Sequence, residues 1–491
     1  MTAPPGVSPG GARSLARAAA SGTKWMAFSQ AGRVIAQLLG VVILARLLSP
    51  SDFGVIAMAW LVTGFANIFH DCGTKAAVIL RRELPSALLD SVFWLNVGIG
   101  VAIAILMALL APVIAEAMGE AQLAKVLWLL ALAFPIGSLG LVQQALLERA
   151  SRFRSVALVE CGAAWAGLTA VILAALAGWG VYSLVSQAIV GWIVLTGGLW
   201  AASMWRPAWR CSLALIREIA GFSGNLVGFE IVRYFARNID TVLIGRFLGA
   251  TDLGYYNLAY RLMIWPLQNT SEVAARALFP ALSRVQEDKP RLRQASVRAA
   301  AATFLLTAPL SLGLFVLREP FVLAVMGERW LKVADLLFWL APVCMVQSVG
   351  TTATLLFVST GRTDVMFKFA VFSSVAVTCA IFVGLQWGVE GVAAAYCATA
   401  LVLFWPNLAL SFRLVDLSVI AFLRRLLPTL FTALLMALFV AAVAEHSAML
   451  VQAQWARLLV LAALGAALYV AVSIFVQRPL LKDISVAFFF R

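Results

Sequence analysis

The chain has 491 residues, of which 63% are hydrophobic and only 12% are charged, and its mean hydropathy is +0.95. A soluble globular protein is about 45–50% apolar and about 25% charged, so this composition argues against a soluble enzyme, a fibrous protein and a disordered chain. The apolar residues also come in long blocks, each near the roughly 20 residues that cross a bilayer. The sequence therefore predicts a polytopic membrane protein.

The cysteines, the histidines and the search for catalytic motifs give no indication of a disulfide framework, a metal site or an enzyme active site. Six cysteines without a CxxC pair predict small buried side chains and no disulfide framework. His70 and His446 are the only histidines, too few for a multi-histidine metal site. Because the sequence also lacks the GxxxxGK[ST], GxSxG and HExxH motifs, we expect no enzyme activity, no metal and no cofactor.

Fourteen apolar blocks follow a Gly/Pro-rich segment, residues 1–22, which lacks the apolar core of a signal peptide and is predicted to be a cytoplasmic tail. The links between blocks are short, with at most roughly 15 residues, so they hold no extramembrane catalytic domain. Backbone groups in lipid must be satisfied internally, and the blocks are too long for barrel strands. The predicted membrane helices are 24–47, 53–74, 88–114, 122–147, 156–177, 180–204, 219–248, 254–280, 296–317, 333–359, 366–386, 389–412, 426–444 and 456–477.

Lysine and arginine are distributed unevenly between alternate links. The set that includes both termini carries 25 of them, and the opposite set carries 7. Cytoplasmic loops are enriched in Lys and Arg, so both termini are predicted to be cytoplasmic, in a chain embedded in the inner membrane. The net charge of +14 is thus mostly an orientation signal, and no nucleic-acid partner is expected.

A duplication relates the two halves of the chain. Residues 42–54 (VILARLLSPSDFG) are similar to residues 242–254 (VLIGRFLGATDLG), and Arg33 and Arg233 fall on the same offset of 200. Few residue types occur in membrane sequences, so chance similarity is the alternative. Matches of charged residues and glycine at one spacing favour duplication.

Six spans per half is an even number, so the halves point the same way across the membrane. Such repeats are typical of transporters, with the substrate site at their interface. We predict two parallel six-helix lobes around a central cavity, residues 1–205 and 206–415, followed by two helices within residues 416–491.

The motifs at these positions resemble a known family. They are residues 42–50, Asp52-Phe53-Gly54, Asp71-Cys72-Gly73, residues 79–82 and 93–96, and in the second half residues 240–249 and 253–260. As a set, over residues 20–480, they resemble the Wzx-like polysaccharide flippases of the MOP superfamily. The resemblance implies transfer of an undecaprenyl-diphosphate-linked sugar between leaflets by two lobes that open alternately to either side. Sugar-contacting residues vary in that family, so no sugar specificity is implied.

Five arginines lie inside predicted spans: Arg33, Arg233, Arg237, Arg261 and Arg276. Each would cost about 2.5–3.5 kcal/mol at a helix centre facing lipid, so we expect them to face water or a partner. Guanidinium groups bind phosphate oxygens bidentately and stay charged at any relevant pH. A cationic, water-filled cleft suited to a lipid diphosphate is therefore predicted.

Polar neighbours at helical spacing accompany these arginines on the first, seventh and eighth spans. The predicted substrate-binding residues are Gln30, Arg33, Gln37, Arg233, Arg237, Arg261, Gln268 and Asn269. Candidates for a cytoplasmic gate are Asp71, Glu272 and Arg276, and candidates for ion coupling are Glu160, Glu230 and Asp240.

Simpler interpretations stay open for several of them. Glu230–Arg233 and Arg237–Asp240 are i, i+3 pairs that can merely neutralise each other. Arg276 lies where its side chain can extend to the membrane surface. Glu160 can bind a coupling cation or pair with an arginine. Arg33 has no acid nearby on its own helix and is the strongest candidate for phosphate.

The favoured function is flipping of a polyprenyl-diphosphate-linked oligosaccharide for capsule, exopolysaccharide or O-antigen assembly, with membrane lipids, a polymerase and export machinery as partners. A flippase for the peptidoglycan precursor is the nearest alternative. A multidrug–cation antiporter is disfavoured because the predicted cleft is basic. A membrane polysaccharide polymerase is disfavoured because the outer links are short.

Overall fold

The computed structural model describes residues 9–71, 74–81, 84–209, 212, 224–283, 288–450 and 453–477, and these residues form helices and no strand. The helices of the first half are α1 (Pro9–Leu47), α2 (Pro50–Asp71), α3 (Thr74–Leu80), α4 (Ser86–Met118), α5 (Ala121–Ala131), α6 (Ala133–Arg149), α7 (Phe153–Leu176), α8 (Val181–Ala202) and α10 (Gly224–Phe247). Those of the second half are α11 (Gly249–Ser283), α12 (Lys289–Val316), α13 (Arg318–Val325), η1 (Glu328–Trp330), α14 (Leu331–Ser359), α15 (Thr363–Gly384), η2 (Leu385–Trp387), α16 (Gly388–Arg413), α17 (Val419–Leu450) and α18 (Gln454–Val476).

The predicted all-helical membrane fold is confirmed. Eleven helical segments within the described residues are long and apolar enough to cross a membrane, and one of them, Thr363–Arg413, contains the two helices α15 and α16. These segments cover twelve of the predicted spans. The seventh and eighth predicted spans correspond to α10 and α11, which are long enough to cross but contain several charged residues.

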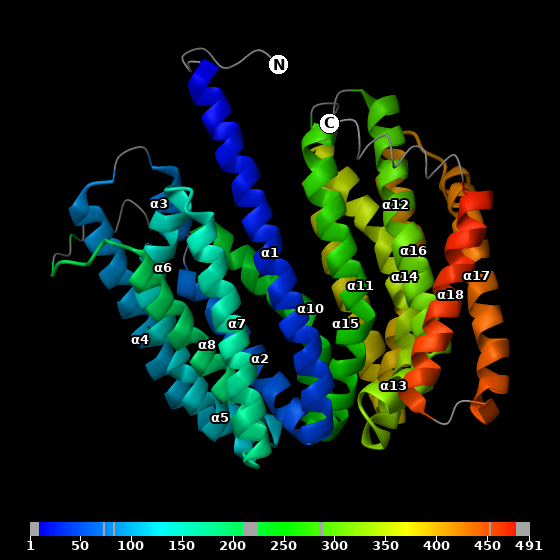
Figure 1. Cartoon of the computed structure of the whole chain (residues 1–491), viewed down its shortest axis with the longest axis horizontal. Coiled ribbons are helices and arrows are strands. Elements are labelled where there is room, and N and C mark those ends of the chain that lie inside the picture. Colours follow the sequence, from blue (N-terminus) through cyan, green and yellow to red (C-terminus); the bar gives the residue numbers. More distant parts are fainter. Residues whose placement is uncertain are drawn as a thin grey trace. The chain divides into compact units, whose positions relative to one another are not determined.

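The first contact unit of the chain is Met1–Ala250. Within it α7 lies side by side with α8 and also packs along α1 (Figure 1). The helix α4 packs on both α5 and α6, and α6 packs on α8. The helix α2 is joined to α10 by a bond from Tyr234 Oη to the Leu61 carbonyl at 2.7 Å.

The second unit is Thr251–Arg491. Its centre is α14, which packs on α12 and α16, while α15 packs on α16. The last two membrane helices, α17 and α18, pack on each other, and α17 also packs on α12. The predicted lobe boundary at residue 205 stays a prediction.

A second repeated motif, Trp179-Gly180-Val181 and Trp387-Gly388-Val389, has a glycine with positive φ in both copies. Gly180 precedes α8 with φ 54°, and Gly388 begins α16 with φ 70°. This left-handed region is readily accessible to glycine and costly for other residues. One glycine-dependent turn therefore leads into the sixth and the twelfth predicted spans alike.

Candidate functional site

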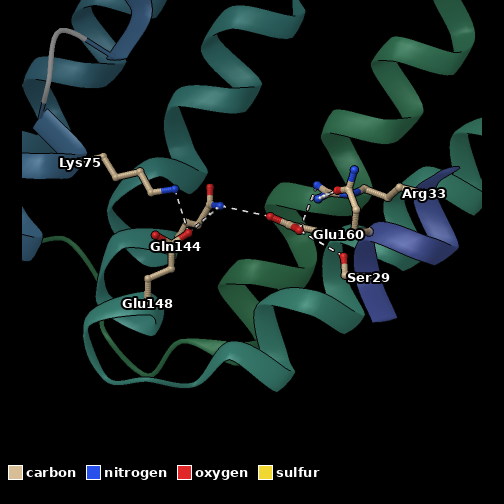
Figure 2. A network of polar contacts seen from close by, with 7 residues as sticks. Ser29, Arg33, Lys75, Gln144, Glu148 and Glu160 are labelled. Atoms are coloured by element: carbon tan, nitrogen blue, oxygen red, sulfur yellow. Dashed lines mark hydrogen bonds and ion pairs between the residues drawn. The ribbon is translucent and has the colours of Figure 1, made fainter. Parts of the chain in front are cut away.

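Arg33 of α1 forms an ion pair with Glu160 of α7 (Figure 2). Arg33 Nη1 lies 3.1 Å from Glu160 Oε2, and the same carboxylate oxygen accepts a hydrogen bond from Ser29 Oγ at 3.3 Å. Arg33 Nη2 donates to Gln30 Oε1 at 2.8 Å. Glu160 was predicted either to bind a coupling cation or to pair with an arginine, and in the structure it pairs with Arg33.

A close helix crossing brings this pair together. A methyl group on Gly32 of α1 would lie 2.7 Å from Cys161 Sγ on α7, closer than real Cβ atoms come to a neighbour. Two turns further along, a methyl group on Gly40 would lie 3.4 Å from Leu168 Cδ1. Glycine on α1 therefore lets α7 approach closely enough for Arg33 and Glu160, the neighbours of Gly32 and Cys161, to meet.

The ion pair belongs to a longer polar network. Gln144 Nε2 on α6 donates to Glu160 Oε1 at 3.5 Å and to Glu148 Oε1 at 3.0 Å. Lys75 Nζ on α3 lies 2.8 Å from Glu148 Oε1. Figure 2 shows these side chains in a row from α3 through α6 and α7 to α1. We call this set, with Ser29 and Gln30, the Arg33 network.

The charges of the Arg33 network balance, with two cations and two carboxylates. The Arg33 side chain remains 42% exposed, whereas that of Glu160 is 20% exposed. A guanidinium has five N–H donors, and the structure records Arg33 donating to Gln30 and pairing with Glu160. Arg33 thus retains donors and open surface with which to receive an anion.

The remaining predicted residues fall on three helices. Gln37 is exposed on α1, and Arg237 is exposed on α10. Glu230 and Asp240 are half-buried on α10, and Asp240 Oδ1 accepts the backbone N–H of Thr241 at 2.7 Å. In the second unit, α11 places Arg261 half-buried and Gln268 exposed.

The structure brings together only some of the candidates. Within the described side chains, the predicted residues that meet are Gln30, Arg33 and Glu160. The side chains of Asp71, Arg233, Asn269, Glu272 and Arg276 lie outside the described residues.

Four members of the Arg33 network were not predicted as site residues: Ser29, Lys75, Gln144 and Glu148. Lys75 and Glu148 lie near span ends, where charged residues are ordinary. Gln144 was the available signal, since it is a polar residue inside a predicted apolar span.

The comparisons with known proteins decide the family. The family described as Polysaccharide biosynthesis protein matches residues 43–335, more than half of the chain. This chain is a member of that family. The resemblance predicted from the duplicated motifs is thereby confirmed.

Relatives of this polysaccharide biosynthesis protein match along most of their length. The lipopolysaccharide biosynthesis protein WzxC of Escherichia coli is 29% identical over 379 residues, which cover 76% of each chain. The succinoglycan biosynthesis transport protein ExoT of Rhizobium meliloti is 28% identical over 468 residues, which cover 93% of each chain.

Solved structures share the fold of this polysaccharide biosynthesis protein at low identity. The lipid II flippase MurJ in an inward closed conformation has a TM-score of 0.73 at 16% identity, covering 92% of this chain and 99% of its own. An inward-facing multidrug resistance transporter of the MATE family has a TM-score of 0.61 at 14% identity, and the match covers 79% of this chain and 96% of the transporter. These similarities establish the fold, and the substrate has to be inferred from the residues of the site.

Proposed function

We propose that this protein flips a polyprenyl-diphosphate-linked oligosaccharide from the inner to the outer leaflet by alternating access, for polysaccharide assembly. One observation carries the proposal: a half-exposed guanidinium, Arg33, is held by Glu160 within an apolar helical unit. The similarity to WzxC, a lipopolysaccharide biosynthesis protein, and to ExoT, a succinoglycan biosynthesis transport protein, supports the same substrate class.

The lipid diphosphate explains why an arginine is useful at this place. Moving a bare anion through hydrocarbon would cost on the order of tens of kcal/mol. A phosphate can take over the exposed side of Arg33 and then displace Glu160, forming two parallel N–H···O bonds. Glu160 keeps its contacts with Ser29 and Gln144 when Arg33 turns to the ligand, so displacement does not leave the carboxylate bare.

The other predicted residues complete the proposal. Arg233, Arg237 and Arg261 supply further positive charge to the headgroup, and Gln37, Gln268 and Asn269 supply hydrogen bonds. Asp71, Glu272 and Arg276 form the cytoplasmic gate, while Glu230 and Asp240 are the other candidates for ion coupling. Both termini lie in the cytoplasm, and the product passes to a polymerase and export machinery.

Complementation of a strain that lacks this protein tests the role of Arg33. Arg33→Gln removes charge-assisted hydrogen bonds worth about 1.5–3 kcal/mol each, so exported polysaccharide should fall by about 10-fold to 100-fold. Arg33→Lys keeps the charge without the bidentate geometry and should give an intermediate level.

Arg362→Gln is the matched control, because Arg362 pairs with Asp364 at 3.2 Å and is 52% exposed but lies at the start of α15, outside the Arg33 network. Export in this variant should stay at the wild-type level. Normal export with Arg33→Gln, at equal amounts of protein in the membrane, would reject the proposed role of Arg33.

A peptidoglycan-precursor flippase is the second candidate, because the MurJ structure has the TM-score of 0.73. Expression of this protein in cells depleted of their own lipid II flippase distinguishes the two. Rescued growth without restored polysaccharide export would favour the peptidoglycan precursor.

A further inference from the structure

A cavity of about 170 Å³ lies inside the first unit, among α2, α5, α6 and α8. It is much larger than the space that holds one water and smaller than the roughly 300–1,000 Å³ of pockets for drug-sized ligands. Of its lining residues, Leu130, Ala133 and Phe134 are buried, whereas Asn67 is exposed. The cavity is therefore an indentation that admits one small ring from outside the unit.

The walls combine aromatic faces with polar groups. Trp60 and Trp192 contribute indole rings, and Thr63 and Asn67 lie on α2 among the lining residues. His70, one turn beyond Asn67, lies 2.8 Å from Ser138 Oγ through Nε2. Apolar ring faces next to hydroxyl and amide groups suit a ligand that has both C–H faces and hydroxyl groups.

Two of these polar groups lack a partner within the described part of the chain: the side-chain amide of Asn67 and the indole N–H of Trp192. Asn67 is exposed and Trp192 is half-buried, so a molecule in the cavity can reach both groups. These groups can therefore be satisfied by a bound ligand that accepts and donates hydrogen bonds.

The lining residues also define the charge of the ligand. None of the nine lining residues is Lys, Arg, Asp or Glu. A diphosphate or a uronic acid would lack a cation there, and an organic cation would lack a carboxylate. An acyl chain would desolvate the exposed amide of Asn67 without replacing its hydrogen bonds to water. A neutral sugar ring meets all of these conditions.

The cavity lies close to the Arg33 network along α6. The Trp192 ring packs on Gly137, where a methyl group would come within 3.0 Å of it. Gly137, Gly140 and Gln144 are spaced i, i+3, i+7 and so share one face of α6. Seven residues of helix correspond to about 10 Å along α6, from Gly137 beside Trp192 to Gln144, which is joined to Arg33 through Glu160.

We propose that this cavity is the subsite for a neutral hexose of the lipid-linked glycan, near the diphosphate at Arg33. This inference rests on the proposed function. Trp60 and Trp192 stack on the ring, and Asn67 and the Trp192 N–H hydrogen-bond to its hydroxyl groups. The subsite makes this part of the protein a determinant of sugar specificity.

Binding to the purified full-length protein, in detergent, tests the subsite with three probes: farnesyl diphosphate, farnesyl diphosphate carrying one glucose or galactose, and the same probe carrying one glucuronic acid. The variants are Trp192→Phe, which keeps a ring and removes the N–H, and Asn67→Leu, which keeps the size of the side chain. Trp128→Phe is the matched control, because its N–H donates to the Ala108 carbonyl at 2.9 Å, away from the cavity.

The wild type should bind at least one of the hexose probes about 10-fold more tightly than farnesyl diphosphate, and the glucuronic acid probe without that gain. Combining Trp192→Phe with Asn67→Leu should abolish the gain and leave binding of farnesyl diphosphate unchanged, which also shows that the variant is folded. Trp128→Phe should bind all three probes as the wild type does.

Two results would overturn the subsite while the proposed function stands: binding of farnesyl diphosphate at Arg33 without any gain from either hexose, or a gain that survives both substitutions. Absence of binding for every probe, or equal binding by Arg33→Gln, would instead count against the proposed function itself.

Discussion

Replacing Glu160 by glutamine removes the negative charge that competes with an anionic ligand for Arg33. The two charged groups are 3.1 Å apart, and unit charges at that distance attract by about 5 kcal/mol at an effective dielectric constant of about 20. Because the Arg33 side chain is 42% exposed, desolvation and solvent screening reduce the net value to about 1 kcal/mol. Glu160→Gln should therefore bind farnesyl diphosphate about 5-fold more tightly than the wild type.

Isothermal titration calorimetry of the purified protein measures this change. Arg33→Gln should weaken binding, and in that background Glu160→Gln should have no further effect, since the competing pair no longer exists. Glu148→Gln is the matched control, because Glu148 pairs with Lys75 and not with Arg33. Unchanged or weaker binding by Glu160→Gln in an otherwise wild-type protein would refute competition between the carboxylate and the phosphate.

Two further predictions concern glycines. Gly32→Ala should lower the thermal stability of the protein by an amount equivalent to about 1–3 kcal/mol, because its methyl group would lie 2.7 Å from Cys161 Sγ. Adding Cys161→Ala should restore the stability. If it does not, the contact with Cys161 is not the cause of the loss. Gly54→Ala should lower the amount of folded protein recovered by size-exclusion chromatography more strongly, since its methyl group would overlap the Ala250 carbonyl oxygen, a backbone atom that cannot turn away. A methyl group on Gly98 would have no neighbour within 4 Å, so Gly98→Ala should give the wild-type yield in size-exclusion chromatography. Equal yields of Gly54→Ala and Gly98→Ala would contradict the steric argument.

The sequence predicted the membrane helices well, because each span is a local property of about 20 residues. The polar helices α10 and α11 were also predicted, since their charged residues recur on a helical period. The left-handed turns at Gly180 and Gly388 were visible in sequence only as a repeated motif.

The Arg33 network shows where that reasoning stops. Ser29 and Glu160 are separated by 131 residues, and Arg149 and Val78, which hydrogen-bond nearby, by 71. Such partners depend on which helices pack together, and periodicity within one helix does not determine that. The choice of α7 as the neighbour of α1 rests in part on Gly32, a residue whose role becomes visible only beside Cys161.

The matching turns at Gly180 and Gly388 align the two copies of the duplication at an offset of 208 residues. At that offset Glu160, the acid beside Arg33, corresponds to Lys368, which is exposed on α15. The position that holds an acid in the first copy holds a base in the second, so the two copies differ in the sign of the charge at this place.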